Sequence, residues 1–269
     1  MAKYTFGFIG TGNMGGALAR AAVKRLPPEK IILANRTPAK AQALATELGC
    51  VAADNDAVAA DSEYIFLGVK PQLMAGMLAG IAPALAARRD RFILATMAAG
   101  LTMDRIRALA GGDYPVLRIM PNTPAAIGAG MILYASDARV TGAETAAFLE
   151  ALADAGRFDE LPEHLIDAGS AVSGCGPAFL YMFIEALADG GVAAGLPRVK
   201  AQAYAAQMAV GAARMVLESG SHPGALKDAV CSPGGSTIMG VKALEDGGFR
   251  SAAINAVLEA LRRNRELGQ

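Results

Sequence analysis

The sequence lacks an excess of charge of either sign, because 25 lysines and arginines are balanced by 25 aspartates and glutamates. A chain without a global positive field has little to hold nucleic acid or an anionic membrane. It also lacks the composition of a disordered chain, since 53% of its residues are apolar and 19% are charged. We therefore expect a compact soluble protein whose partner is a small-molecule substrate, with no nucleic acid and no membrane.

Cysteine is scarce, and Cys50, Cys175 and Cys231 are far apart in the sequence. They form neither a CxxC pair nor a metal-ligand cluster, so we expect reduced thiols and no bound metal. The chain starts without the long apolar run of a secretion signal. The alanine-rich stretch 74–87 is shorter than the roughly 20 apolar residues that span a bilayer, and it contains Pro83. These absences predict a cytoplasmic protein.

The first half alternates short apolar runs with helical patterns, which is typical of βαβ units around a parallel sheet. Most of the runs are continuously apolar, as expected when helices cover both faces of the sheet. The predicted strands are 5–9, 31–34, 64–69, 92–96, 116–120 and 131–135, with a last short one near 157–161. The predicted helices are 14–25, 38–48, 71–87 and 143–155.

The second half has no strand pattern and consists of long alanine-rich helical segments, 177–194, 197–219, 235–246 and 249–267. We expect an α/β protein with an N-terminal Rossmann doubly wound sheet, residues 1–161, followed by an all-α domain, residues 162–269. The segment 201–216 is apolar nearly all round, which suits a helix buried in an obligate interface. We therefore expect an intertwined homo-oligomer, a homodimer or a higher oligomer of dimers.

A glycine-rich turn lies between the first predicted strand and the first predicted helix. It reads Gly10, Thr11, Gly12, Asn13, Met14, Gly15. In this context Gly10 permits the tight turn, Gly12 lets a phosphate approach the backbone, and Gly15 allows the helix to pack on the strand. The turn thus predicts a dinucleotide pyrophosphate at the helix N-terminus. A plain strand-to-helix turn is the alternative.

The end of the second predicted strand indicates which dinucleotide is held. An acidic residue there would bind the ribose 2′-hydroxyl of NAD, whereas this chain has Asn35, Arg36 and Thr37. A guanidinium and two polar neighbours can donate to a 2′-phosphate, so NADP(H) is favoured and NAD(H) is expected to bind less well. The alternative is a solvated arginine in a loop.

Two further loops follow predicted strands at the edge where open α/β sheets bind ligands. One contains Val69, Lys70 and Pro71, and the other contains Met97, Ala98 and Ala99. We expect both loops to line the nicotinamide half of the cofactor. An ordinary surface lysine is the alternative for Lys70, but its position before a proline at a strand end favours a cofactor contact.

Three dense turn motifs contain no charged residue: 120–124, 173–177 and 232–237. The last precedes an apolar helix and offers the hydroxyls of Ser232, Ser236 and Thr237 together with free backbone N–H groups. Such a helix N-terminus suits a small carboxylate. A helix cap without a ligand is the alternative.

Taken together, these motifs resemble the pyrroline-5-carboxylate reductases over nearly the whole chain. The resemblance rests on 10–16, 35–37, 69–71, 120–124, 173–177 with Phe179, and 226–228 leading into 232–238. It implies reduction of 1-pyrroline-5-carboxylate to L-proline by hydride transfer from NADPH, the last step of proline biosynthesis, and a helical dimerisation domain. Cys175, where serine or alanine is usual, and Ser236, where threonine or alanine is common, depart from the pattern by small changes only.

The resemblance also assigns residues to the site. It adds Asn55, Lys70 and the loop 97–99 to the cofactor site. It implies that the substrate is held by Ser232, Gly234, Gly235, Ser236 and Thr237.

The motifs contain no histidine or carboxylate, and the two histidines, His164 and His222, lie outside them. A ketone reductase would need a proton donor in the transition state, but an imine can enter with its nitrogen already protonated. We therefore expect Thr237, aided by Ser232, to hydrogen-bond the nitrogen and relay a proton.

Two other functions remain open at this point. An NADP-dependent reductase like the β-hydroxyacid dehydrogenases would need a catalytic lysine, for which Lys200 is the candidate, but the residues around it do not fit that family's motif. A catalytically silent NADP-binding regulator would keep the glycine turn without needing an intact 232–237 loop.

Overall fold

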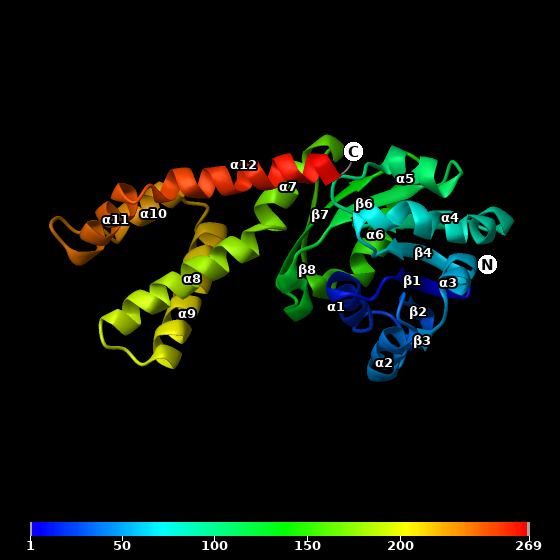
Figure 1. Ribbon diagram of the computed structural model, residues 1–269, viewed down its shortest axis with the longest axis horizontal. Helices are drawn as coiled ribbons and strands as arrows, with labels where there is room; N and C mark the ends of the chain where they lie inside the picture. Colours follow the sequence, from blue (N-terminus) through cyan, green and yellow to red (C-terminus); the bar gives the residue numbers. More distant parts are fainter. Residues whose placement is uncertain (1, 268–269) are drawn as a thin grey trace. The chain divides into compact units, whose positions relative to one another are not determined.

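The computed structural model describes residues 2–267, whose strands form one eight-stranded sheet in the order β3-β2-β1-β4-β5-β6-β7-β8 (Figure 1). The strands are β1 (Tyr4–Ile9), β2 (Ile31–Ala34), β3 (Val51–Ala52), β4 (Ser62–Leu67), β5 (Ile93–Thr96), β6 (Val116–Met120), β7 (Gly130–Ser136) and β8 (Gly156–Glu160). The chain runs outward from β1 to β3 and then returns to place β4 on the other side of β1. This reversal is the switch point at which open α/β sheets bind ligands.

The helices connecting these strands are α1 (Asn13–Ala22), α2 (Pro38–Leu48), α3 (Asn55–Asp61), α4 (Pro71–Ala87), α5 (Met103–Ala110), α6 (Gly142–Ala151) and α7 (Glu163–Ser173). Short 3-10 helices η1 (Pro28–Lys30), η2 (Thr123–Ile127) and η3 (Ala153–Ala155) complete the connections. The predicted α/β class with a doubly wound sheet is confirmed. The short helices α3 and α5 and the two-residue strand β3 are absent from the sequence prediction.

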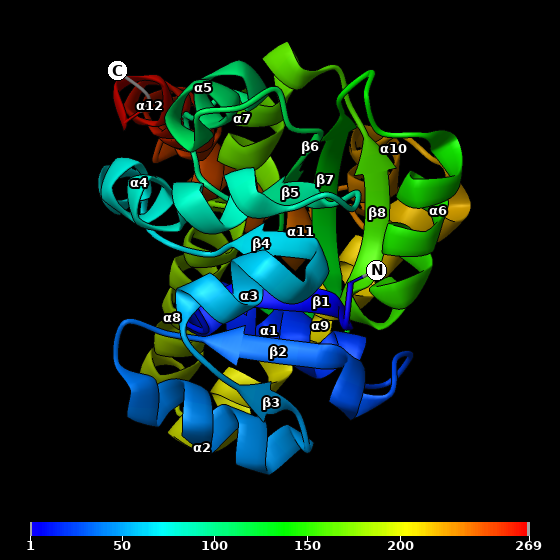
Figure 2. The same cartoon turned by 90° about the vertical axis from the view of Figure 1, so that its right-hand side faces the viewer.

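The central strands β1, β2, β4, β5 and β6 bury both of their faces, because successive side chains point to opposite sides of a sheet and helices cover each side. One face packs against α3, α4, α5 and α7, through residues such as Leu78, Ile106 and Ile166 (Figure 2). The other face packs against α1, α2 and α6 and holds stacked aromatic rings, with Phe8 and Phe66 centroids 4.2 Å apart. Burial on both faces explains why these strands appear in the sequence as continuous apolar runs.

Strand β7 runs antiparallel to β6, whereas the strands from β3 to β6 are all parallel to their neighbours. The connection between β6 and β7 contains only the short helix η2. A parallel pairing needs a crossover of a dozen or more residues, so this connection is too short for one. The loop that follows β6 therefore stays at the ligand-binding edge of the sheet.

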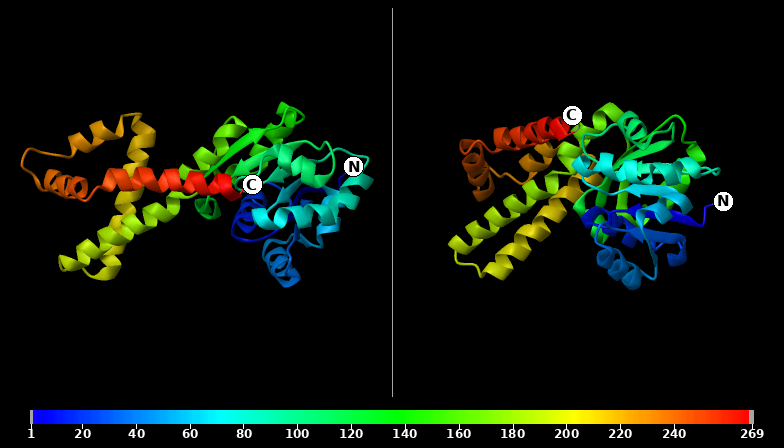
Figure 3. Two further views of the ribbon diagram at one scale, coloured as in Figure 1. Left: turned by 45° about the horizontal axis from the view of Figure 1, so that its top comes forward. Right: turned by 45° about the vertical axis from the view of Figure 1, so that its right-hand side comes forward.

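The chain forms two compact units, one made of residues 2–175 with 260–267 and the other of residues 176–259. The second unit contains α8 (Gly176–Ala193), α9 (Arg198–Ser219), α10 (Pro223–Ala229), α11 (Ser236–Asp246) and the first part of α12 (Phe249–Leu267). Helices α8 and α9 lie side by side and antiparallel (Figure 3), joined by a turn at Gly195, whose φ is +96°.

The second unit leaves large apolar side chains exposed in the single chain. Met182 is 70% exposed, Val199 80% and Leu217 71%. The helical stretch 163–193 is long and apolar enough to cross a membrane by length and composition, with 11% of its most apolar window buried. Exposed apolar surface of this extent marks a region that another surface covers.

The capping box of α6 provides a test of the electrostatics of the fold. Glu144 accepts hydrogen bonds from the backbone N–H of Thr141 and from Arg91, and these partners lower the pKa of Glu144 to about 2. A lowered pKa in the folded state contributes stability that is present above the unfolded pKa of about 4.3 and lost as the pH falls.

We expect Glu144→Gln to lower the free energy of unfolding at pH 7 by on the order of 1 kcal/mol. The difference from the wild type should shrink as the pH falls from about 4.3 towards 2, measured by thermal or urea unfolding. Glu150→Gln on the same helix is the matched control, because the Glu150 side chain is 73% exposed. Equal effects of both substitutions at every pH would contradict this account.

Candidate active site

In the glycine turn after β1, the backbones of Gly10, Gly15 and Gly68 lie so close together that none of these residues has room for a side chain. Gly10 has a φ of +102°, and a Cβ at this position would lie 2.4 Å from the carbonyl oxygen of Gly68. A Cβ at Gly15 would lie 2.1 Å from the carbonyl oxygen of Gly10. Backbone hydrogen bonds from Gly10 N–H to Ala34 and from Gly68 N–H to Ile9 join β1 to its neighbours at this point. The turn is therefore locked between β1, β2, β4 and α1.

Gly12 differs from the other glycines of the turn. A Cβ at Gly12 would meet no heavy atom within 4 Å, and its φ of −74° is open to any residue. Gly12 is the N-cap of α1, and no side chain caps this helix. The first N–H groups of α1 thus face open space, which suits a phosphate at the helix N-terminus.

A hydrogen-bonded chain joins this turn to the end of β2. The Asn35 amide nitrogen donates to the Thr11 hydroxyl at 3.0 Å, and the Asn35 amide oxygen accepts from the Thr37 backbone N–H at 3.0 Å. Arg36 is exposed, and among residues 2–267 no carboxylate pairs with its guanidinium. Its charge is available to an anion from solvent.

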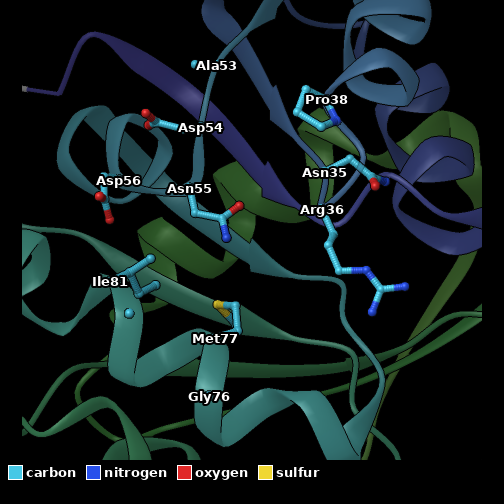
Figure 4. Close-up of a pocket in the computed structure, with 11 residues that line it drawn as sticks. Asn35, Arg36, Pro38, Ala53, Asp54, Asn55, Asp56, Gly76, Met77 and Ile81 are labelled. Carbon is cyan, nitrogen blue, oxygen red and sulfur yellow. The ribbon is translucent and has the colours of Figure 1, made fainter.

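Asn35, Arg36 and Asn55 line one pocket of about 500 Å³, together with Pro38, Ala53, Asp54, Asp56, Gly76, Met77, Gly80 and Ile81. Figure 4 shows the Asn55 and Met77 side chains near each other, and the Arg36 guanidinium extending away from the carboxylates of Asp54 and Asp56. The Asp54 carboxylate accepts from the Ala57 N–H at 2.8 Å and so caps α3. The pocket has an apolar wall from α4 and a polar rim from the β2 and β3 loops, which suits a nucleoside.

The loops after β4 and β5 meet next to the glycine turn. Lys70 is the exposed N-cap of α4, with Pro71 as the first helical residue. A Cβ at Gly68 would lie 3.0 Å from the Met97 methyl carbon, so Met97 packs against the backbone after β4. The structure thus places the predicted cofactor residues of the first unit at the carboxyl ends of β1, β2, β4 and β5, with Asn55 after β3.

The motif 120–124 follows β6 at this same edge of the sheet. Asn122 donates to the Ser173 carbonyl oxygen at 2.9 Å and accepts from the Met131 N–H at 3.0 Å. Thr123 lines a pocket with Gly12. Asn122 therefore ties the 120–124 motif to the start of the 173–177 motif, and its own amide is used by the fold.

The stretch 232–237 lies in the second unit and contains the start of α11, with Gly235 as the N-cap and Ser236 and Thr237 as the first helical residues. Gly234 has a φ of +66°, and the Gly235 N–H donates to the Ser232 carbonyl oxygen at 3.0 Å. Ser232, Ser236 and Thr237 are exposed, and within the described chain their hydroxyls make no hydrogen bond. No side chain caps α11. Free hydroxyls and free N–H groups at one helix end can hold a small carboxylate.

Sequence reasoning missed Gly68, the two carboxylates of the 500 Å³ pocket, Asp54 and Asp56, and the α4 residues of its wall. Gly68 could have been found, because it follows an apolar strand as Gly10 does. The α4 residues carry no such signal, since they are typical of any amphipathic helix. Burial raises the pKa of the Cys175 thiol, which disfavours the thiolate that a nucleophilic cysteine requires.

The fold and the site define a class: a Rossmann-type dinucleotide-binding protein with a separate helical unit. Residues 163–267 match the family described as pyrroline-5-carboxylate reductase dimerisation, and residues 5–99 match that described as NADP oxidoreductase coenzyme F420-dependent. The chain is 41% identical to the pyrroline-5-carboxylate reductase of Escherichia coli K12 and 44% to that of Synechocystis, covering 98% of each protein and 98% of this chain. This chain belongs to the pyrroline-5-carboxylate reductase family.

Solved structures agree with this membership. The Plasmodium falciparum pyrroline carboxylate reductase with NADP bound has a TM-score of 0.89 at 29% identity, and covers 100% of both chains. The Streptococcus pyogenes 1-pyrroline-5-carboxylate reductase has a TM-score of 0.88 at 29% identity, over 97% of this chain and 98% of that one. The predicted family is therefore confirmed. The predicted domain boundary after residue 161 stays a prediction. In the structure the first compact unit extends to residue 175, and α7 packs within it.

Gly12 provides a test that separates binding from folding. We expect Gly12→Ala to fold with nearly unchanged thermal stability, because its Cβ meets nothing, while it weakens dinucleotide binding at least about tenfold by blocking the close phosphate approach. Titration of NADPH by fluorescence measures the affinity. Gly142→Ala, another glycine whose Cβ would meet nothing, is the control and should bind as the wild type does. Wild-type affinity in Gly12→Ala would contradict the assignment of the turn.

Proposed function

We propose that this chain reduces 1-pyrroline-5-carboxylate to L-proline with NADPH, the last step of proline biosynthesis. The single observation that carries the proposal is the 41–44% identity to proteins named pyrroline-5-carboxylate reductase over 98% of the chain. The open helix N-terminus at Gly12 and the unpaired charge of Arg36 support the cofactor half of the proposal. The full-length similarity favours this reaction over a β-hydroxyacid dehydrogenase, as does the lack of that family's motif around Lys200.

The residues of the first unit fit a dinucleotide. The turn 10–15 would hold the pyrophosphate, with Asn35, Arg36 and Thr37 at the adenosine 2′-phosphate and Asn55 beside the adenine. Val69, Lys70 and Pro71, with Met97, Ala98 and Ala99, would line the nicotinamide end. When bound, NADPH supplies the hydride. Because an arginine and not a carboxylate occupies the end of β2, NADH should bind less well.

The reaction adds a hydride to the imine carbon and leaves a proton on nitrogen, so one C=N bond becomes C–N and C–H. A ring imine that enters protonated already carries that proton, and its carbon is electrophilic. The chain's task is to place and desolvate it. We assign the carboxylate of the substrate to the N–H groups and hydroxyls of Ser232, Gly234, Gly235 and Ser236, and its nitrogen to Thr237.

We further propose that the chain is a homodimer or an oligomer of dimers and works in the cytoplasm, without nucleic acid or membrane partners. The family match over 163–267 is to a dimerisation region, and the same region contains the exposed apolar side chains Met182, Val199 and Leu217. A second copy of the chain accounts for the apolar stretch 163–193 without a membrane.

An NADPH-oxidation assay with 1-pyrroline-5-carboxylate tests the function. We expect turnover with NADPH, less with NADH, and less with the six-membered ring analogue. Arg36→Gln should raise KM for NADPH by about 10- to 100-fold, the worth of one charge-assisted phosphate contact, and change KM for NADH little. A wild-type chain that binds NADPH but does not oxidise it with this substrate would favour a catalytically silent NADP-binding regulator.

Thr237 is tested by removing its hydroxyl. We expect Thr237→Ala to lower kcat by about 10- to 100-fold, the range of a lost positioning or proton-relay contact, with little change in NADPH affinity. Thr237→Ser keeps the hydroxyl and should retain most of the turnover. Wild-type kcat in Thr237→Ala would refute the proposed contact with the imine nitrogen.

A further inference from the structure

Arg118 is a charged side chain in the interior of the sheet unit. It lies in the middle of β6, paired in register with Thr96 of β5 and Ala135 of β7, and it is 1% exposed. Its strand neighbours on the same face belong to the apolar core that includes α5 and α7. A guanidinium cannot be neutralised at ordinary pH, so its burial is costly unless it is well paired.

Two carboxylates of α7 pair with this guanidinium. Asp167 Oδ1 lies 2.6 Å from Arg118 Nη2, and Glu163 Oε1 lies 3.7 Å from Arg118 Nη1. Asp167 and Glu163 are four positions apart in sequence, so both lie on one side of α7. Arg118 Nε is buried and has no hydrogen-bond partner within residues 2–267. The ion pair therefore joins β6 to α7.

The same two carboxylate oxygens also accept backbone N–H groups from the segment between β5 and α5. Asp167 Oδ1 accepts from the Gly100 N–H at 3.3 Å, and Glu163 Oε1 accepts from the Met103 N–H at 2.6 Å. Gly100 has a φ of +76°, so the backbone bends there. The segment 97–103 is thus attached at Gly100 and at Met103.

The part of α12 in the first unit adds a contact, since buried Asn264 donates to the Asp167 carbonyl oxygen at 3.4 Å. A buried ion pair stabilises a fold weakly, and apolar side chains of similar size often replace one at no loss of stability. The buried position of Arg118 is therefore better explained by the geometry that its ion pair holds than by added stability.

We propose that Arg118 and Asp167 are positioning residues that fix the segment 97–103, and with it the nicotinamide-facing loop 97–99, in its reactive conformation. The inference rests on the proposed function for the role of that loop. Arg118 and Asp167 touch neither cofactor nor substrate in this account. They act through the Gly100 N–H. Asp167 accepts this N–H only while the Arg118 guanidinium fixes the Asp167 carboxylate in place.

The test is the double variant Arg118→Met/Asp167→Leu, which removes the closer charge pair together. Glu163 loses its guanidinium but keeps the Met103 N–H, and its side chain is 26% exposed. A misplaced nicotinamide slows hydride transfer without weakening contacts to the rest of the dinucleotide. We expect kcat to fall by about 10- to 100-fold, and NADPH affinity by fluorescence to stay within about threefold of wild type, since contacts outside the loop remain. The deuterium isotope effect with NADPH labelled at the transferred hydrogen should rise.

Arg88→Met is the matched control. The Arg88 side chain is 3% exposed and bonds Asp90 and the Ser62 carbonyl oxygen, at the start of β4 and away from the loop 97–99. Arg88→Met should lower stability but leave kcat per folded enzyme and the isotope effect unchanged. If the double variant loses only stability, as this control does, the proposal is overturned.

A second measurement does not depend on turnover. Amide hydrogen exchange of the chain without cofactor or substrate should be at least about tenfold faster at 97–103 in the double variant, because the Gly100 N–H loses its acceptor. If the double variant does not fold, amide hydrogen exchange at 97–103 is measured in Arg118→Lys instead. If the wild type lacks reductase activity, the proposed function fails while exchange still decides whether the anchor exists. Wild-type exchange at 97–103 overturns the anchor.

Discussion

The structure of the cofactor end depends on one steric constraint: the backbones of Gly10, Gly15 and Gly68 lie so close together that none of them has room for a Cβ. The carbonyl oxygen of Gly10 would lie 2.1 Å from a Cβ at Gly15 and 2.5 Å from one at Gly68. This close approach brings the N-terminus of α1 against the switch point between β1 and β4. The positions of the loops after β2, β4 and β5 are then set as well, because β2 and β4 pair in register with β1, and β5 pairs in register with β4. We therefore propose that rigid backbone supplies most of the cofactor affinity and that Arg36 adds selectivity for the 2′-phosphate.

Periodicity and turn chemistry predicted most of the fold. The apolar runs identified the strands, because helices cover both faces of the sheet. The breaks at Gly195 and Gly247 identified the ends of the long helices. The antiparallel pairing of β7 was not predicted, although the short connection between the predicted strands 116–120 and 131–135 already excludes a parallel crossover. Helix α3 was missed because seven residues are too few to show a period clearly. The predicted strand 64–69 in fact ends at Leu67, since Gly68 leaves the sheet to pack on Gly10.

The site was predicted unevenly for a physical reason. Residues whose backbone conformation makes them diagnostic, such as Gly10, are visible in a sequence, and so is a polar cluster at a strand end, such as Asn35 to Thr37. The wall of the 500 Å³ pocket comes from Gly76, Met77 and Ile81, which any helix could contain. The proposed role of 232–237 rests on resemblance to a family, because a helix cap and a carboxylate site use the same residue types.

Arg118 is the strongest case of a residue whose environment the sequence conceals. The run 116–120 reads as an apolar strand with one arginine, and such an arginine would ordinarily point to solvent. Only the fold shows that this position faces the interior, where α7 supplies two carboxylates 2.6 and 3.7 Å away. Because each carboxylate also accepts a backbone N–H of the segment 97–103, removing the charge pair changes loop geometry and core polarity together. A hydride-transferring site with no acid or base in its motifs depends mainly on position, so the residues that hold its loops deserve the same tests as those that line it.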